Sequence, residues 1–212
     1  MKKYVAEFIG TFVLVFCGTG AIVLNDTLEG MLGDFGIGVV FGLSVTAMIY
    51  CYKHISGAHI NPAVTIGFAV TNLFNNKDLF GYIVAQILGG ILASVSIHLL
   101  VPSYQKLGVT EAHIGIIQTF VLEFFLTLLL MLVIIFVSQH KKWASATAIA
   151  VGGIVFLEAW LAGPFTGASM NPARSIAPAL VSAQLTTLWI YILAPILGSL
   201  AAVGIWLFTN RK

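Results

Sequence analysis

The chain alternates long apolar runs with short polar segments. A helix that crosses a lipid bilayer needs about 20 mostly apolar residues, and six runs approach or exceed this length. These predicted spans cover residues 4–24, 36–53, 81–100, 115–138, 143–162 and 186–208. The pattern therefore predicts an all-α membrane protein with six transmembrane helices.

Two shorter stretches, residues 61–73 and 171–183, each begin with Asn-Pro-Ala. Asparagine is a favoured N-cap, and proline suits the first helical position because the N–H that it lacks has no helical partner there. At ~1.5 Å per residue, each stretch spans about half of the ~30 Å hydrocarbon core. We expect two re-entrant half-helices that enter from opposite faces and meet end to end.

The Asn-Pro-Ala segments belong to a longer internal repeat. Residues 56–65 (Ser-Gly-Ala-His-Ile-Asn-Pro-Ala-Val-Thr) return as residues 166–175 (Thr-Gly-Ala-Ser-Met-Asn-Pro-Ala-Arg-Ser). The similarity continues in two further pairs of segments, residues 7–11 with 123–127 and residues 81–89 with 190–198.

Each half of the chain contains three predicted spans, an odd number, so the second half must enter the membrane from the other side. We expect a single transmembrane channel domain over residues 1–212, built from inverted repeats of approximately 1–105 and 110–212. A polar turn at membrane depth is tolerated where it is buried in protein or lines a water-filled path. The repeat therefore predicts a pore where the two half-helices meet.

The composition agrees with a membrane location. Hydrophobic residues make up 59% of the chain and charged residues 8%, with a mean hydropathy of +1.01, whereas soluble domains carry about 25% charged residues. The bilayer must therefore act as part of the solvent. A formal charge of +2 is too small to indicate a nucleic-acid partner.

Basic residues are distributed unevenly between the predicted loops. With both termini on the cytoplasmic side, that side holds eight Lys and Arg residues: Lys2, Lys3, Lys53, Lys77, Lys141, Lys142, Arg211 and Lys212. The opposite side holds Lys106 alone, and Arg174 belongs to neither. Because positive loops stay cytoplasmic, we expect a multi-pass plasma-membrane protein with both termini in the cytoplasm.

Several charged and amide side chains are expected at membrane depth. Arg174 is costly there and must face water or a partner, with a structural salt bridge as the alternative. Glu7 and Glu123 need hydrogen-bond donors, for which the backbone N–H groups of the re-entrant loops are the candidates. The N-termini of the two half-helices, which face each other, create a positive potential. The side-chain amides of Asn61 and Asn171 can donate there to the oxygen of a passing molecule. The alternative is that both asparagines only cap their helices.

These features together resemble the aquaporin (major intrinsic protein) family. The resemblance rests on the paired Asn-Pro-Ala motifs, on Glu-x-x-x-Thr in the first and fourth spans, and on Arg174 three residues after Asn171. It covers essentially the whole chain. It implies a passive channel that assembles as a homotetramer with one pore in each subunit.

The resemblance also implies roles for individual residues. The central constriction would consist of Asn61, Pro62, Ala63, Asn171, Pro172 and Ala173. Carried over by position, the selectivity filter would consist of Phe41, Ala159, Ala168 and Arg174. Glu7 and Glu123 would brace the loops. For His59 we expect either a place in a vestibule or hydrogen bonding of the first loop. Glu158, next to the proposed filter, has no counterpart in the repeat and is a candidate brace of the loop at residues 163–169.

The filter positions bear on the range of solutes. Water channels of the family usually have a histidine where Ala159 stands, so this filter should be wider and more apolar. Ser175 and Ala179 match the water-type pattern, whereas residues 163–170 look most like the plant nodulin-type proteins, which pass water, glycerol and neutral metalloid acids. We expect passage of water and of small uncharged solutes such as glycerol, urea or metalloid acids, without protons or ions. A strictly water-selective channel is the alternative.

Two other classes of protein compete with a channel. A secondary transporter also has inverted repeats and interrupted helices, but it usually needs titratable groups near the midplane, where this chain offers neutral asparagines. An intramembrane enzyme would need a Ser/His, paired-Asp or metal-ligand constellation, and the predicted spans contain none with a plausible geometry. We therefore expect no enzymatic activity, no cofactor, no metal and no nucleic acid. The expected partners are water, small neutral solutes and the lipid bilayer.

Overall fold

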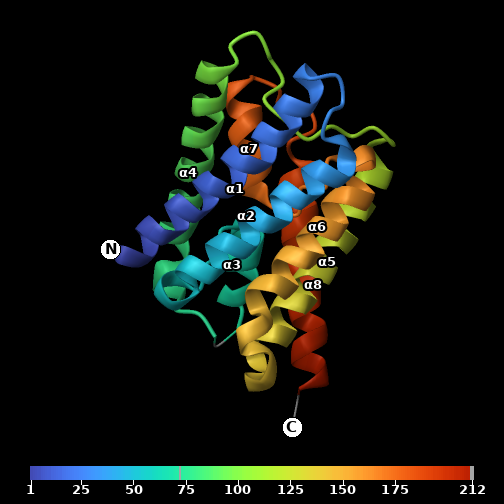
Figure 1. The fold of residues 1–212 in the computed structure, drawn as a ribbon. Coiled ribbons are helices and arrows are strands. Elements are labelled where there is room, and N and C mark those ends of the chain that lie inside the picture. The colour runs from blue at the N-terminus through green and yellow to red at the C-terminus, as the bar shows by residue number, and fades with distance from the viewer. Residues whose placement is uncertain (72, 211–212) are drawn as a thin grey trace.

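The computed structural model describes residues 1–71 and 73–210, and the regular elements found there are helices (Figure 1). The long helices are α1 (Lys2–Thr27), α2 (Gly33–Ser56), α4 (Leu79–Leu100), α5 (Ile116–Gln139), α6 (Thr147–Thr166) and α8 (Ile190–Thr209). The short helices are α3 (Pro62–Ala69) and α7 (Pro172–Val181), with 3-10 turns η1 (Asn76–Asp78) and η2 (Lys141–Ala146).

Six of the described helices are long and apolar enough to cross a membrane, which confirms the predicted number of spans. Their ends differ from the apolar runs by a few residues. α1 and α2 extend beyond both ends of their runs, whereas α6 and α8 begin four residues later than expected. The half-helices are shorter than expected, since α3 ends at Ala69 and α7 at Val181. Arg211 and Lys212, which count in the charge asymmetry, lie outside the described residues, as does the side chain of Lys141.

Helix packing follows the same scheme in both halves of the chain. α1 packs against α2 and α4, and α5 packs against α6 and α8. The half-helices are exchanged, because α3 packs mainly on α8 and α7 mainly on α4. Contact between α2 and α6 joins the two halves. This arrangement is the one expected of an inverted repeat.

α3 and α7 lie in opposite halves of the bundle and are in contact with each other (Figure 1). They contain 8 and 10 residues, which at ~1.5 Å per residue gives lengths of about 12 and 15 Å. Both helices start at the proline of Asn-Pro-Ala, as predicted. Placed end to end, the two helices supply close to one membrane crossing.

Glycines let the long helices approach each other closely at equivalent positions of the two halves. A Cβ added at Gly89 in α4 would overlap the carbonyl oxygen of Phe8 in α1. A Cβ added at Gly198 in α8 would overlap the carbonyl oxygen of Phe124 in α5. Small residues of this kind allow the van der Waals packing that holds helices together in lipid.

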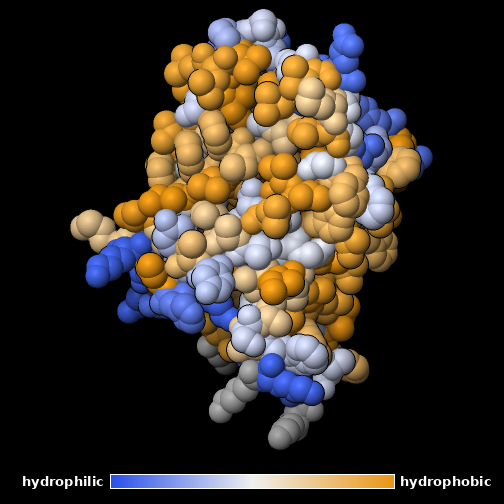
Figure 2. Space-filling model, viewed as in Figure 1, coloured by the Kyte–Doolittle hydropathy of each residue, from blue (hydrophilic) through white to orange (hydrophobic). Residues whose placement is uncertain are grey.

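The face of the bundle seen in Figure 2 is mostly apolar, and hydrophilic side chains gather toward its ends. Large side chains such as Phe80, Ile117 and Phe208 are at least three-quarters exposed. In water such a surface would be an extensive apolar patch. Facing lipid tails it needs no further cover, which agrees with a membrane protein.

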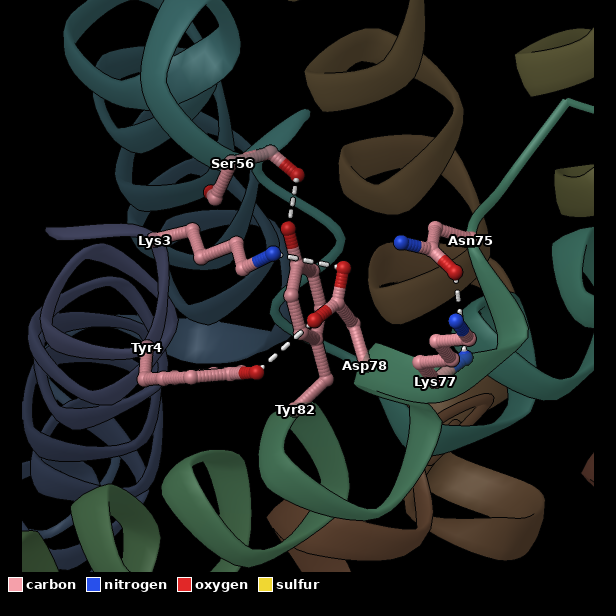
Figure 3. A network of polar contacts seen from close by, with 7 residues as sticks. All are labelled: Lys3, Tyr4, Ser56, Asn75, Lys77, Asp78 and Tyr82. Atoms are coloured by element: carbon pink, nitrogen blue, oxygen red, sulfur yellow. Dashed lines mark hydrogen bonds and ion pairs between the residues drawn. The ribbon is translucent and has the colours of Figure 1, made fainter. Parts of the chain in front are cut away.

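A polar network ties the start of α1 to the segment before α4 (Figure 3). The ammonium of Lys3 lies 2.6 Å from the Asp78 carboxylate, and the Tyr4 hydroxyl donates to the same carboxylate at 2.8 Å. The Tyr82 hydroxyl donates to the carbonyl of Ser56 at 2.8 Å. The contacts thus link α1, η1, α4 and the end of α2, the elements that flank α3.

We expect Gly89→Ala to lower the unfolding temperature, because the new methyl group meets a backbone oxygen that cannot rotate away. Overpacking of this kind typically destabilises by about 1–3 kcal/mol. Gly153→Ala in α6 is the matched control, since a Cβ there meets nothing within 4 Å. Thermal unfolding of the purified variants in detergent measures the effect. Equal unfolding temperatures for the two variants would contradict the packing argument.

Candidate functional site

Two loops, residues 57–61 and 167–171, meet where the N-termini of α3 and α7 face each other. The side-chain amide of Asn61 donates to the carbonyl of Met170 at 2.8 Å. The side-chain amide of Asn171 donates to the carbonyl of Ile60 at 2.9 Å. Both asparagines are buried. These reciprocal hydrogen bonds join the two halves of the chain at the centre of the bundle.

The same asparagines cap the half-helices. The side-chain oxygen of Asn61 accepts from the N–H of Ala63 at 2.8 Å, and that of Asn171 accepts from the N–H of Ala173 at 3.0 Å. An amide nitrogen carries two N–H groups, of which one is used across the loops. Because both side chains also line the cavity described below, capping leaves each asparagine with an N–H for a further acceptor.

Four residues of the loops have the left-handed backbone conformation without being glycine: Ala58 (φ 50°), Ile60 (φ 44°), Ala168 (φ 39°) and Met170 (φ 53°). Such a conformation costs about 1–2 kcal/mol for each L-residue and is rare for a β-branched side chain such as that of Ile60. The strained positions are equivalent in the two loops. The surrounding structure must therefore hold both loops in place.

The first loop is held by Glu7 of α1, whose side chain is fully buried. Its carboxylate accepts from the backbone N–H of His59 at 2.9 Å and of Ile60 at 2.6 Å, and from the Ser56 hydroxyl at 2.7 Å. The carboxylate thus supplies acceptors to N–H groups that have no helical partner. A buried carboxylate needs such donors in return.

The second loop is held in the same way by Glu123 of α5. Its carboxylate accepts from the N–H of Ser169 at 2.9 Å and of Met170 at 3.0 Å, and from the Thr166 hydroxyl at 2.8 Å. The structure therefore places both intramembrane glutamates against the re-entrant loops. Their contacts match at equivalent positions of the repeat.

Sequence reasoning did not single out Gln86, which is fully buried in α4. Its side-chain amide donates to the Glu7 carboxylate at 2.7 Å and to the Thr65 hydroxyl at 2.9 Å. Pro195 stands at the equivalent position of the second half, so Glu123 has no such partner. A glutamine inside an apolar run was the signal that could have found this residue.

A cavity of about 280 Å³ passes the junction of the two loops. Four residues of α2 that are spaced by one helical turn line it: Phe41, Val45, Ile49 and Lys53. Asn61 and Asn171 line it as well, as do Ala159, Ala168 and Arg174. Over the 12 residues from Phe41 to Lys53, α2 advances about 18 Å at its rise of ~1.5 Å per residue. The cavity is therefore elongated along the bundle.

A second cavity, of about 220 Å³, adjoins the first. Phe41, Ala159 and Arg174 line both cavities, whereas Ala168 lines the first alone. Three of the four residues assigned to a filter thus stand at the junction of the two spaces. Tyr104 lines the second cavity, and burial together with a hydrogen bond to Asp26 raises the pKa of its hydroxyl, so it remains a neutral donor.

Arg174 is 1% exposed. Its Nη1 donates to the carbonyl of Gly108 at 2.8 Å, and the guanidinium carbon lies 5.5 Å from the centre of the Phe41 ring. Within the described residues its Nε and Nη2 have no partner, and no carboxylate lies at ion-pair distance. Gly18 makes room for the Phe41 ring, which a Cβ there would overlap.

His59 and Glu158 are placed differently. His59 lines the first cavity, and its Nδ1 lies 3.2 Å from the hydroxyl of Thr65 in α3. Glu158 is buried but lines neither cavity, and its carboxylate has no partner among the residues described. The described part of the chain contains no group of three or more His, Cys, Asp or Glu residues arranged to hold a metal ion.

A model of the family described as "Major intrinsic protein" matches residues 1–206. The chain belongs to the major intrinsic protein family. Among curated members, "Nodulin-26" of Glycine max is 42% identical over 210 residues, which cover 98% of this chain and 77% of that protein. "Aquaporin NIP1-1" of Zea mays is 40% identical over 218 residues, covering 100% of this chain and 77% of that protein.

A solved structure supports the same assignment at the level of the fold. The X-ray structure of the aquaglyceroporin from Plasmodium falciparum matches this major intrinsic protein with a TM-score of 0.88 at 27% sequence identity. The match covers 97% of this chain and 94% of that chain. The fold is therefore that of an aquaporin, and the chain is a membrane channel of this family.

We expect Gln86→Leu to destabilise this major intrinsic protein by about 1–3 kcal/mol, because the Glu7 carboxylate and the Thr65 hydroxyl lose a buried partner. Gln105→Leu is the matched control, since Gln105 is exposed and donates to the carbonyl of Pro102. Thermal unfolding in detergent compares the two variants. If both unfold at the wild-type temperature, Gln86 does not support the first loop.

Proposed function

We propose that the chain is a passive transmembrane channel for water and small uncharged solutes such as glycerol, urea or metalloid acids, and that it excludes protons and ions. The observation that carries the proposal is the pair of adjoining cavities. Together they extend from Lys53 past Asn61 and Asn171 to Arg174 and beyond. A path with neutral polar groups midway suits molecules without charge.

The walls of this path combine apolar side chains with a few hydrogen-bond donors. The donors are the remaining amide N–H groups of Asn61 and Asn171 and the unpartnered Nε and Nη2 of Arg174. A neutral solute that sheds water on entry regains hydrogen bonds from them. An ion loses a far larger hydration energy, which so few donors cannot replace.

The central constriction that we propose consists of Asn61, Pro62, Ala63, Asn171, Pro172 and Ala173. Each half-helix carries roughly +0.5 of an elementary charge at its N-terminus, and the two N-termini face each other here. The resulting positive potential opposes cations, including hydronium. A water molecule that accepts from both asparagines is also poorly oriented to pass a proton along a chain of waters.

We assign the selectivity filter to Phe41, Ala159, Ala168 and Arg174. Two of the four side chains are single methyl groups, so the filter has little side-chain volume to exclude a solute larger than water. The names of the relatives agree with this reading, since one is an aquaglyceroporin and others are nodulin or NIP proteins. A strictly water-selective channel remains the alternative.

Several further features belong to the proposal. The inverted repeats comprise residues 1–105 and 110–212, and Glu7 and Glu123 brace their loops. The protein is a homotetramer of the plasma membrane, with both termini and the Lys53 end of the path in the cytoplasm. The charge asymmetry of the loops supports this orientation. A secondary transporter fits less well, because neutral Asn61 and Asn171 occupy the middle of the path.

Reconstituted protein tests the proposal directly. In stopped-flow light scattering we expect proteoliposomes to respond to water, glycerol and urea gradients faster than protein-free liposomes. Water flux without glycerol or urea flux would favour the strictly water-selective alternative. Saturable uptake that depends on a proton or sodium gradient would instead favour a transporter.

We expect Ala159→His to reduce glycerol flux by about tenfold or more while water flux falls less, because one added group in a fitted site discriminates by about 10–200-fold. Ile149→His is the control on the same helix, since Ile149 is 73% exposed on the outer surface. The same stopped-flow measurement applies. Unchanged glycerol flux in Ala159→His would show that the filter is assigned to the wrong residues.

A further inference from the structure

The two cavities differ in the charges that line them. Within the described residues, the first cavity has three titratable side chains, all of them basic: Lys53, His59 and Arg174. The second cavity contains carboxylates as well, from Asp26, Asp34 and Glu111. Arg174 lies where the cavities join. Lys53 lies three helical turns from Phe41 along α2, so the two permanent cations stand on opposite sides of Asn61 and Asn171.

Lys53 is fixed rather than freely mobile. Its ammonium donates to the carbonyl of Ala144 at 2.7 Å and to the Thr147 hydroxyl at 2.8 Å, and the residue is half-buried. Both partners belong to η2 and the start of α6. An ammonium has three N–H groups, so one donor remains after these two hydrogen bonds. The charge is therefore held at the wall of the path.

We propose that Lys53 is a specificity-determining residue, which opposes cations at the end of the path remote from Arg174. The inference rests on the proposed function, because it treats the first cavity as the conduction path. A fixed positive charge beside a passage with partly apolar walls repels a cation more strongly than it would in bulk water. An uncharged solute meets no such repulsion and can accept the remaining N–H.

The surroundings of Lys53 favour this role over that of a simple tie between helices. No carboxylate lines the described part of the first cavity, so nothing there neutralises the ammonium. Both of its partners are uncharged oxygens, which orient the group without cancelling its charge. Ser138 and Gln139 line the same cavity and are neutral as well.

The charges on the path act in series, so the contribution of Lys53 is best measured when the other barrier is weakened. Replacing Arg174 by valine removes the cation at the junction of the cavities. The half-helix N-termini remain, and so does Lys53. In this background, cations that pass the filter still have to pass the ammonium at the other end.

The experiment uses proteoliposomes that contain the full chain with Arg174→Val. This variant is compared with three double variants, in which Lys53→Gln, Lys53→Arg or Lys142→Gln is added to it. Lys53→Gln keeps a donor but loses the charge, and Lys53→Arg keeps the charge. Lys142→Gln removes an exposed lysine that lines neither cavity. We expect Lys53→Gln to raise K⁺ and H⁺ leak by about tenfold or more, because unit charges a few ångström apart interact by several RT at an effective dielectric constant of about 20. Lys53→Arg and Lys142→Gln should leave the leak at the background level.

Water permeability of the same vesicles keeps the two hypotheses apart. If Lys53→Gln leaks no more than Arg174→Val alone while water still passes, the role of Lys53 is overturned and the channel stands. If Lys53→Arg leaks as much as Lys53→Gln, charge is not the cause and the inference is again overturned. Wild-type vesicles without water permeability would refute the proposed channel itself.

Discussion

In a bilayer, every backbone N–H and C=O that leaves a helix must find a partner inside the protein. The loops at residues 57–61 and 167–171 meet this constraint through hydrogen bonds to buried side chains and to each other. Buried carboxylates supply acceptors to the loop N–H groups, and the amides of Asn61 and Asn171 supply donors to the carbonyls of the opposite loop. Because each asparagine bonds the other half of the chain, neither loop is complete alone.

The other features of the site depend on this hydrogen-bond network. It holds four loop residues in the left-handed backbone conformation, which persists only where the surrounding structure fixes it. It places the N-termini of α3 and α7 opposite each other. It also fixes the loop that precedes α7, whose first turn contains Arg174. Phe41 and Ala159 come from long helices instead, so the junction of the cavities keeps its shape only while loops and helices keep their relative positions.

The six spans and the two helix starts could be predicted because their causes are local: apolar length, and proline after an N-capping asparagine. The placement of both glutamates against the loops followed from the general need of a buried carboxylate for donors. Gln86 stands out locally as a glutamine inside an apolar run, but its two partners, Glu7 and Thr65, are distant in sequence, so its contacts could not be predicted. The ends of the half-helices were also missed. α3 ends at Ala69 and α7 at Val181, where the hydroxyls of Thr71 and Ser182 donate to the carbonyls of Phe68 and Pro178 in the last helical turn.

The buried acidic and basic side chains lie in different places relative to the two cavities. The buried carboxylates Glu7, Glu123 and Glu158 line neither cavity, whereas the cations Lys53 and Arg174 do. The acidic groups that line a cavity all belong to the second one: Asp26, Asp34 and Glu111. A carboxylate beside Asn61 and Asn171 would attract cations to a place where they are poorly hydrated. Glu7 and Glu123 hydrogen-bond the loops from outside both cavities instead. In the path that we propose, the groups that face a solute midway must be neutral, must cap a helix and must donate to a carbonyl of the opposite loop. Of the common side chains, asparagine meets all three demands with the shortest reach.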